Sequence, residues 1–580
     1  MSITRLCTIS FAFCLFASTA WGQQDTVLPD LAPREVEITG DLAISFPALR
    51  RQPIAGFNPP PRVPDIPADR EPYTEAYTQR SAALPPSPLI PPDPPQISGM
   101  AQRTPAGGLI EARIGAFLDR RIAAQATLVR TRKTTALLDV DYFGSDGHDV
   151  TVGGADATSG RDAYRGGLGL EHRTGALVMN LEAEGFRRSY GLFGAVPGAA
   201  TISRPNPARK FGGYEGRVSF ASAPDAAIQF RWETRTGRSH VQTDLFDPAL
   251  RRDPATKREA GFAGTTFRVD LPVFDGNLRL SADAIGTGLD EASFPGGTVR
   301  SGLFSAEFSR KVSARLSAGA GATILGFDSR SQTGRDPARQ LAYVAPIVDI
   351  AYAASSTVTV EAAVRSMMSS GYLRDIMEEV PVVMDEPVML PSIATLDARL
   401  GVHFESKVAS ARVSGGWRDQ PFHRLAAEPD APLRGYTEGY PALSYRSADV
   451  LFSSVDLSML PMEGLQIGLN ALWQDATLAS TGSSVPYVSP LAIGGFISLN
   501  LLGGDLESRL SLRYEASRTA DTAGTIDVPS VTRINAQVAW FFHSNYSIIT
   551  GVRDLGPSQE FWRNYAYEST AFFLGLRYRW

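Results

Sequence analysis

Histidine and serine are the residues from which a catalytic or metal site in this chain would have to be built. None of the six histidines stands two or four positions from another; they are His148, His172, His240, His403, His423 and His543. This spacing does not place two imidazoles on one face of a strand or helix, so it predicts no metal site. A hydrolase would need serine, histidine and an acid or amide to converge, which spacing across strands does not establish. We therefore expect no cofactor and no enzymatic activity.

Half of the ten methionines lie in residues 367–390, a segment that also carries five acidic residues. These methionines are Met367, Met368, Met377, Met384 and Met389. Thioethers suit soft metals such as Cu(I) and carboxylates suit hard cations, so the mixture selects neither. Methionine is also an adaptable packing residue, and we favour a loop that packs over a pore or binding surface above a metal-capturing loop.

The elements that must position these residues are strands. From residue 108 to 580, apolar and polar residues alternate, as where Leu278 and Leu280 alternate with Arg279 and Ser281. A soluble sandwich also shows alternation, but runs of about ten residues or more fit tilted strands that cross a bilayer. Short connections alternate with long ones, as periplasmic turns and external loops do in outer-membrane barrels. We predict an all-β fold: a membrane-spanning antiparallel β-barrel of about 22 strands, with a range of about 18 to 22.

The last strand of this pattern ends the chain on an aromatic residue. One face carries Phe572, Leu574, Leu576, Tyr578 and Trp580. Such a face fits lipid contact, with Tyr578 and Trp580 in an aromatic girdle. A closing strand of this kind resembles the signal by which the barrel assembly machinery recognises outer-membrane proteins. We expect that machinery and outer-membrane lipid as partners, and the net charge of −5 argues against nucleic acid.

Residues 1–22 have the features of a secretory signal peptide, which predicts export to the bacterial outer membrane. Arg5 gives a positive start, residues 6–17 are apolar, and Ala20 and Gly22 supply small residues before a cut at Gln23. The two cysteines of the chain, Cys7 and Cys14, both lie in this stretch. We therefore expect no disulfide and no thiolate metal site in the mature protein.

Residues 23–107 have a different composition, with 14 prolines between Pro53 and Pro95. Proline fixes φ and lacks an amide hydrogen, so we expect an extended segment and not a packed domain. Apolar residues within it suggest docking, either onto a periplasmic partner or into the lumen of the barrel. The residues concerned are Phe46, Leu49, Ile54, Phe57, Pro59, Pro60 and Pro61.

Residues 109–580 resemble the barrel of TonB-dependent outer-membrane receptors. Residues 551–555 (GVRDL) and 575–580 (GLRYRW) are similar to the closing hairpin of these receptors, and residues 485–490 (VPYVSP) are similar to their Ile-Pro-Tyr-x-Pro segment. The resemblance implies transport. It also implies TonB as a partner, because a short segment is similar to the strand that receptors offer to TonB: Glu35, Val36, Glu37, Ile38, Thr39 and Gly40.

The chain departs from these receptors before its barrel. A receptor carries a globular plug there, and residues 23–107 are too few and too rich in proline to form one. A wide barrel without a plug would leak, so we expect the Pro-rich segment, inward-folding loops or another protein in the lumen. Two functions stay open: a transport or binding channel, and a non-conducting structural, anchoring or adhesive barrel that binds a periplasmic partner through its Pro-rich segment.

Inward positions of the expected strands carry both signs of charge. They include Glu111, Arg113, Asp139, Asp141, Glu182 and Glu184. This pattern predicts a wet interior of mixed sign and no simple ion selectivity.

Overall fold

A computed structural model describes twelve segments of the 580-residue chain: residues 107–116, 119–131, 133–152, 155–198, 206–223, 226–244, 257–289, 297–330, 339–384, 389–429, 435–566 and 570–580. All described residues belong to one unit of the chain, Pro72–Trp580. The predicted signal peptide, the segment similar to a TonB-contact strand and the predicted docking residues of the Pro-rich segment lie outside the described residues.

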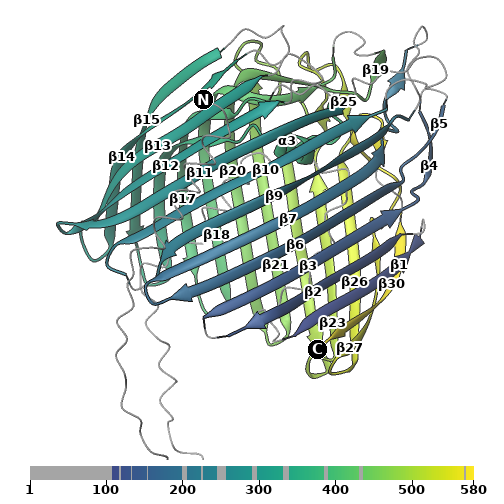
Figure 1. The fold of residues 1–580 in the computed structure, drawn as a ribbon, viewed down its shortest axis with the longest axis horizontal. Helices are drawn as coiled ribbons and strands as arrows, with labels where there is room; N and C mark the ends of the chain where they lie inside the picture. The colour runs from purple at the N-terminus through teal and green to yellow at the C-terminus, as the bar shows by residue number, and fades with distance from the viewer. Residues whose placement is uncertain are drawn as a thin grey trace, which may run out of the picture. The chain divides into compact units, whose positions relative to one another are not determined.

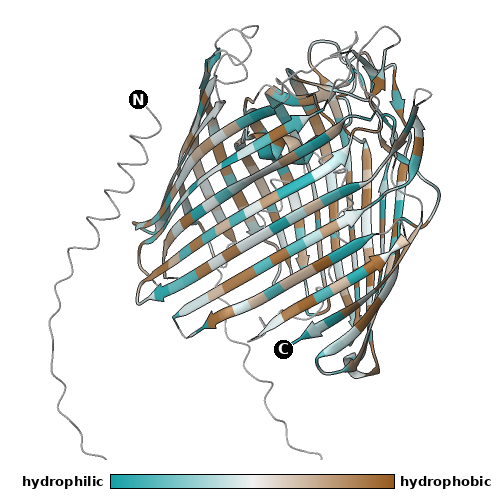
Figure 2. Ribbon diagram, turned by 45° about the vertical axis from the view of Figure 1, so that its right-hand side comes forward, coloured by the Kyte–Doolittle hydropathy of each residue, from teal (hydrophilic) through white to brown (hydrophobic). Residues whose placement is uncertain are grey.

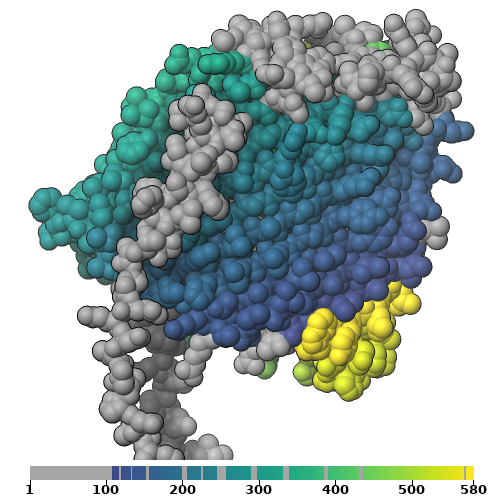
Figure 3. Space-filling view, in the orientation of Figure 1, coloured from purple at the N-terminus to yellow at the C-terminus, as the bar shows by residue number. Residues whose placement is uncertain are grey.

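The described residues form one 22-stranded antiparallel sheet (Figure 1). Strand β1 pairs with β2 on one side and with β30 on the other, so the sheet closes on itself as a barrel. The first strand, in purple, and the last strands, in yellow, accordingly meet in Figure 3. The predicted all-β fold and the predicted count of 22 strands are confirmed.

The barrel strands are β1 (Gly108–Gly115), β2 (Arg120–Arg130), β3 (Thr134–Ser145), β6 (Arg161–Thr174), β7 (Leu177–Gly191), β9 (Ala208–Ser222), β10 (Gln229–Thr243), β11 (Lys257–Val273), β12 (Gly276–Leu289), β13 (Thr298–Lys311), β14 (Leu316–Ser329), β15 (Arg339–Ala353), β16 (Val358–Ser369), β17 (Ser392–Glu405), β18 (Ala409–Ala427), β20 (Ala442–Met462), β21 (Leu465–Leu478), β22 (Leu491–Leu501), β23 (Leu506–Glu515), β26 (Val531–His543), β27 (Tyr546–Arg553) and β30 (Ala571–Arg579).

The connections carry short elements of their own: β4 (Asp149–Val152) paired with β5 (Ala155–Thr158), β8 (Val196–Pro197) paired with β19 (Tyr436–Glu438), β24 (Arg518–Thr519) paired with β25 (Asp527–Val528), β28 (Glu560–Trp562) paired with β29 (Tyr565–Ala566), the helix α3 (Leu373–Glu379) and the 3-10 helix η3 (Leu502–Gly504). Within the described residues, no helix is both long enough and apolar enough to cross a membrane.

The alternation of the sequence separates two faces of the barrel wall. On β15, Val344, Val348 and Ile350 are exposed, whereas Ala345 and Ile347 between them are buried. Exposed apolar residues also occur on other barrel strands, and Figure 2 shows apolar residues, in brown, recurring along the strands. An exposed apolar face is costly in water and is the surface that a bilayer accommodates.

The closing strand β30 follows the same rule. Phe572, Leu574, Leu576 and Trp580 are exposed on the outward face, as the sequence predicts for a lipid-facing strand. On the inward face, Arg577 reaches β1 and donates hydrogen bonds of 2.9 and 2.7 Å to Glu111. The first and last strands are therefore joined by backbone pairing and by a charge pair inside the barrel.

The connections at the two ends of the barrel differ in size. Strands β6 and β7 are joined by a tight turn in which Gly175 has φ of +48°, a conformation that glycine adopts without strain. Strands β16 and β17 are joined at the opposite end by residues 370–391. The predicted alternation of short and long connections is confirmed.

Candidate functional site

The connection between β16 and β17 packs against the inner face of the barrel wall. We call residues 370–391 the α3 loop; the described part comprises residues 370–384 and 389–391. Its helix begins after Tyr372, whose ring lies 4.2 Å from that of Phe262 on β11 and 4.9 Å from the guanidinium carbon of Arg235 on β10. The loop therefore contacts wall strands far from its own attachment points.

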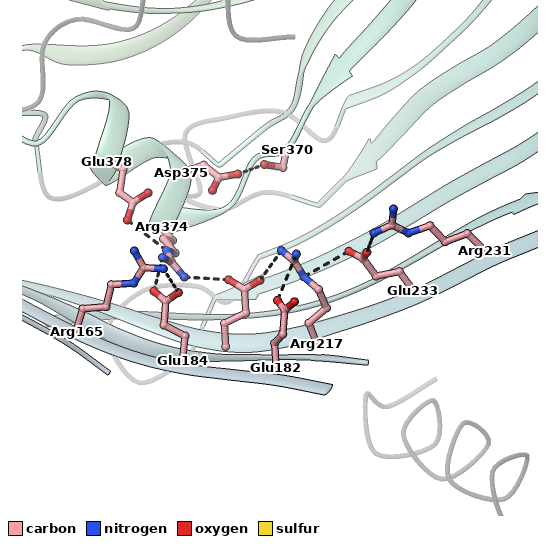
Figure 4. A network of polar contacts seen from close by, with 11 residues as sticks. Arg165, Glu182, Glu184, Arg217, Arg231, Glu233, Ser370, Arg374, Asp375 and Glu378 are labelled. Atoms are coloured by element: carbon pink, nitrogen blue, oxygen red, sulfur yellow. Dashed lines mark hydrogen bonds and ion pairs between the residues drawn. The ribbon is translucent and has the colours of Figure 1, made fainter. Parts of the chain in front are cut away.

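Arg374 is the main polar link between the helix and the wall. Its guanidinium donates hydrogen bonds of 2.6 Å to Glu184 on β7 (Figure 4) and 3.1 Å to Glu215 on β9. It also lies 4.5 Å over the ring of Phe186 and 3.3 Å from Glu378, one turn further along the helix. Burial disfavours the charge of Arg374, but the neighbouring Glu378 and Glu184 outweigh it and raise its pKa.

Charge pairs continue from Arg374 along the wall in both directions. Arg165 on β6 pairs with Glu184 at 3.0 Å, and Arg217 on β9 lies 3.4 Å from Glu233 on β10 (Figure 4). The inner face of these four neighbouring strands is thus a row of alternating charges, as the sequence predicts for a mixed-sign interior. The helix of the α3 loop adds one cation to that row.

Further polar contacts hold the α3 loop on two sides. Arg188 on β7 lies 3.3 Å from Glu378, and Arg424 on β18 pairs with Glu379 and donates a 3.1 Å hydrogen bond to the carbonyl of Ser370. After the helix, the carbonyl of Pro381 accepts hydrogen bonds of 2.9 Å from Tyr190 and 2.6 Å from the fully buried Arg209. Both ends of the helix are therefore tied to the wall by charged or buried donors.

The apolar side of the α3 loop joins a cluster built from several outer connections. Leu373, Ile376, Met377 and Val380 are buried, and Met389 is buried after the helix. The structure thus uses Met377 and Met389 for packing, which agrees with the role favoured from the sequence. Met367 instead lies on β16, where its sulfur is 3.9 Å from Arg399.

We call the members of this group that lie in the other connections the outer-loop cluster. Its members come from connections widely separated in sequence: Leu192, Phe193, Ala195, Tyr436, Tyr440, Tyr487, Ala520, Val528, Phe561, Trp562 and Tyr565. Trp562 is fully buried, and its ring lies 4.1 Å from that of Tyr487; Phe193 and Tyr565 lie 4.9 Å apart. Connections that are widely separated in sequence therefore share an aromatic core.

Buried hydrogen bonds join these connections to one another. The hydroxyl of Tyr487 donates a 2.9 Å hydrogen bond to Glu428, whose second oxygen accepts one of 3.1 Å from the amide of Gly439. Tyr565 donates a 2.8 Å hydrogen bond to the carbonyl of Gly439. Burial raises the pKa of the Glu428 carboxyl, although the hydrogen bond from Tyr487 opposes this rise.

The histidines are not gathered into a site. The part of the chain that the structure describes contains no group of three or more histidine, cysteine or acidic residues arranged to hold a metal ion. Serine and histidine meet at the base of the β4–β5 hairpin, where Ser159 Oγ lies 2.7 Å from His148 Nδ1. Ser159 Oγ also accepts a 3.0 Å hydrogen bond from the amide of His148, so this pair has a local structural role.

Sequence reasoning missed the charge contacts of the α3 loop. Arg374 contacts Glu184 and Glu215, which lie 190 and 159 positions before it in the chain. No local pattern reports such contacts. The helix itself carries a signal, because Leu373, Ile376, Met377 and Val380 follow the i, i+3, i+4, i+7 spacing of an amphipathic helix.

Comparison with known proteins identifies the fold. No family profile and no curated protein sequence matches the chain. Among solved structures, the FrpB iron transporter from Neisseria meningitidis (F3-3 variant) superposes with a TM-score of 0.65 and 9% identity, over 82% of this chain and 81% of that one. The ferric yersiniabactin uptake receptor FyuA from Yersinia pestis has a TM-score of 0.60 and 12% identity, over 82% and 80%.

The copper transporter OprC has a TM-score of 0.60 and 10% identity, over 82% of this chain and 80% of that one. Likeness at these identities concerns the fold. The 22-stranded barrel has the fold of the barrels of TonB-dependent receptors, which confirms the resemblance drawn from the sequence.

Proposed function

We propose that this protein is an outer-membrane transport channel in which the α3 loop controls passage through the barrel. The exposed apolar face of the wall supports residence in a bilayer. The fold supports a transport-type barrel, because solved structures that share it are described as iron and copper transporters and as a ferric yersiniabactin uptake receptor. A substrate does not follow from these names.

The observation that carries the proposal is the bridge from Arg374 to Glu184 and Glu215. These two carboxylates lie on the inner face of neighbouring strands, and the arginine that joins them comes from a loop at one end of the barrel. A hydrogen bond to a charged group is worth about 1.5–3 kcal/mol, so a few such bonds can hold a loop in place and still be broken. Contacts of this strength allow the α3 loop to be held against the wall and to be released.

Planar-bilayer recording of the purified protein tests the gate. We expect Arg374→Ala to raise the fraction of time spent in conducting states, because both wall contacts are lost. Arg310→Ala is the matched control, since Arg310 pairs with Asp275 at 2.9 Å with both side chains more than half exposed. An equal fraction of time in conducting states for the Arg374→Ala variant, the control and the unchanged protein would contradict a gating role.

The N-terminal segments and the C-terminal strand have roles of their own in the proposed function. Residues 1–22 direct export and are removed, the segment 35–40 contacts TonB, and the Pro-rich segment docks through its apolar residues onto a periplasmic protein or into the barrel. The face ending in Tyr578 and Trp580 serves as the assembly signal. Complete electrical silence of folded protein and of its gate variants would favour the alternative, a non-conducting anchor for a periplasmic partner.

A further inference from the structure

The ladder between β15 and β16 covers only part of either strand. Strand β15 pairs with β14 along Arg339–Tyr352, but among the described residues it pairs with β16 only through residues 348–353. On the other side, β16 pairs with β17 along Val358–Ser369, with one irregularity between Arg365 and Met367. Residues 339–347 of β15 therefore have no ladder partner on β16. We call this stretch the β15–β16 seam.

Features at the end of the seam next to Val348 explain why the ladder stops there. Pro346 lies two residues beyond Val348, the last paired position of β15, and proline has no amide hydrogen to donate. Arg365 of β16 points across to Asp349 of β15 and donates hydrogen bonds of 3.1 and 3.0 Å. The hydroxyl of Ser366, in the irregularity, is buried and has no hydrogen-bond partner among the described residues.

The seam begins within the depth of a bilayer. Ile347 is six residues from Ala353 at the opposite end of β15, which corresponds to about 15 Å along the barrel axis for a rise of ~3.4 Å and a tilt of ~40°. The apolar band of such barrels is about 25 Å tall. Lipid-exposed strand edges are avoided in hydrocarbon because their polar groups lack partners. The part of the seam next to Val348 therefore needs an occupant whose polar groups pair with the free backbone edge of β15.

The inner side of the wall behind the seam is apolar, unlike the charged row near Arg374. Ala345 and Leu325 are buried in one cluster with Ile393 and Phe422, and Leu341, Tyr343 and Met368 pack against it. Leu390, at the end of the α3 loop, belongs to the same cluster. On the outward face of β15, Val344 is 76% exposed. Apolar surface thus lies on both sides of an incomplete strand pairing.

We propose that the β15–β16 seam is a lateral entry for a single-chain amphiphile, such as a long-chain fatty acid. The acyl chain packs against the apolar cluster behind the seam, and the polar head contacts Ser366 and the backbone edge of β15. Because Leu390 of the α3 loop is a buried member of this cluster, displacement of the loop opens the path between bilayer and lumen. The seam is a lateral opening of the proposed channel. The inference therefore rests on the proposed function, in which Arg374 attaches the α3 loop to the wall.

Cysteine labelling tests the seam directly, because Cys7 and Cys14 are the only cysteines in the chain. Ala345→Cys is compared with Thr323→Cys, which faces it across the β14–β15 ladder, has the same 3% exposure and lies between two complete ladders. In liposomes, N-hexadecylmaleimide should label the Ala345→Cys variant on the order of tenfold or more faster than the Thr323→Cys variant, since local opening of the seam exposes only the former. Palmitate should slow that labelling.

Two results would overturn the inference. One is equal labelling of the two variants by N-hexadecylmaleimide. The other is faster labelling of the Ala345→Cys variant by a charged, water-soluble maleimide than by the hexadecyl reagent, which would indicate an aqueous path.

A chemical cross-link across the seam distinguishes failure of this inference from failure of the proposed channel. The double variant Ala345→Cys, Met367→Cys, joined by a short bis-maleimide, should lose uptake of palmitate into vesicles and retain ion conductance. Loss of conductance together with uptake would show that the seam belongs to the main pore and would contradict a separate lateral entry. Absence of conductance in the protein without the cross-link, with lipid-side labelling intact, would contradict the channel and leave the seam standing.

Discussion

The α3 loop and the outer-loop cluster share apolar packing, and they differ in the polar contacts that hold them. The helix of the α3 loop is attached to the wall by charge pairs of Arg374, Glu378 and Glu379 with wall residues. The outer-loop cluster is held by aromatic packing around Trp562 and by buried hydrogen bonds to Glu428. Charge pairs can be broken singly and respond to salt, whereas a packed aromatic core is lost as a unit. We therefore expect the α3 loop to detach from the wall more readily than the outer-loop cluster unpacks.

The largest expected effect is in the cluster. Trp562→Ala removes a fully buried indole that packs on Tyr487. We expect the free energy of unfolding in lipid vesicles to fall by about 3–5 kcal/mol, because a large cavity forms. Trp540→Ala is the matched control, as Trp540 is 51% exposed on the outward face. A loss as large in the control as in the Trp562 variant would show that the cluster is not a packed core.

A smaller effect is expected for the α3 loop, whose amide hydrogen exchange should depend on the salt concentration. Raising the salt concentration shortens the Debye length from ~10 Å at 0.1 M to ~3 Å at 1 M. The charge pairs of Arg374 should weaken, so amide hydrogen exchange in Leu373–Glu379 should accelerate several-fold, while exchange in residues 561–565 of the cluster should not change. The Arg374→Ala variant should exchange rapidly at either salt concentration. Equal salt dependence of both regions would contradict the distinction.

The smallest effect concerns the pH dependence of the cluster. Burial raises the pKa of Glu428 above its unfolded value, so the folded state binds the proton more tightly. The cost of burying this charge is therefore present at higher pH and is relieved as pH falls through the raised pKa. We expect the stability of the cluster to rise as the pH falls from neutral towards the ordinary glutamate pKa of 4.5, and Glu428→Gln to remove this gain. An unchanged pH dependence in that variant would show that another group is responsible.

The barrel was predictable because its cause is local. Alternation such as that of Leu278, Arg279 and Leu280 reports one strand at a time, and the closing pattern of Phe572 to Trp580 reports the last one. The outer-loop cluster was not predictable, since Tyr487 and Trp562 belong to connections that show no regular apolar period. Their contact depends on where the barrel places the ends of distant strands.

The α3 loop lies between these two cases. Its methionine content and the spacing of Leu373, Ile376 and Met377 are visible in sequence and predict packing. The partners of Arg374 are not visible, because Glu184 and Glu215 look like any other inward charges on β7 and β9. The β15–β16 seam was likewise hidden: Pro346 marks an edge position only once the ladder of β15 is known.

Control of passage through the barrel by the α3 loop is the central proposal. Its most direct test is single-channel recording of a variant in which residues 372–390 are replaced by a short Gly-Ser linker. We predict long-lived steps of large conductance for this variant and small or infrequent steps for the unchanged protein. Silence of the variant in bilayers, with its β-spectrum and membrane insertion intact, would contradict the account.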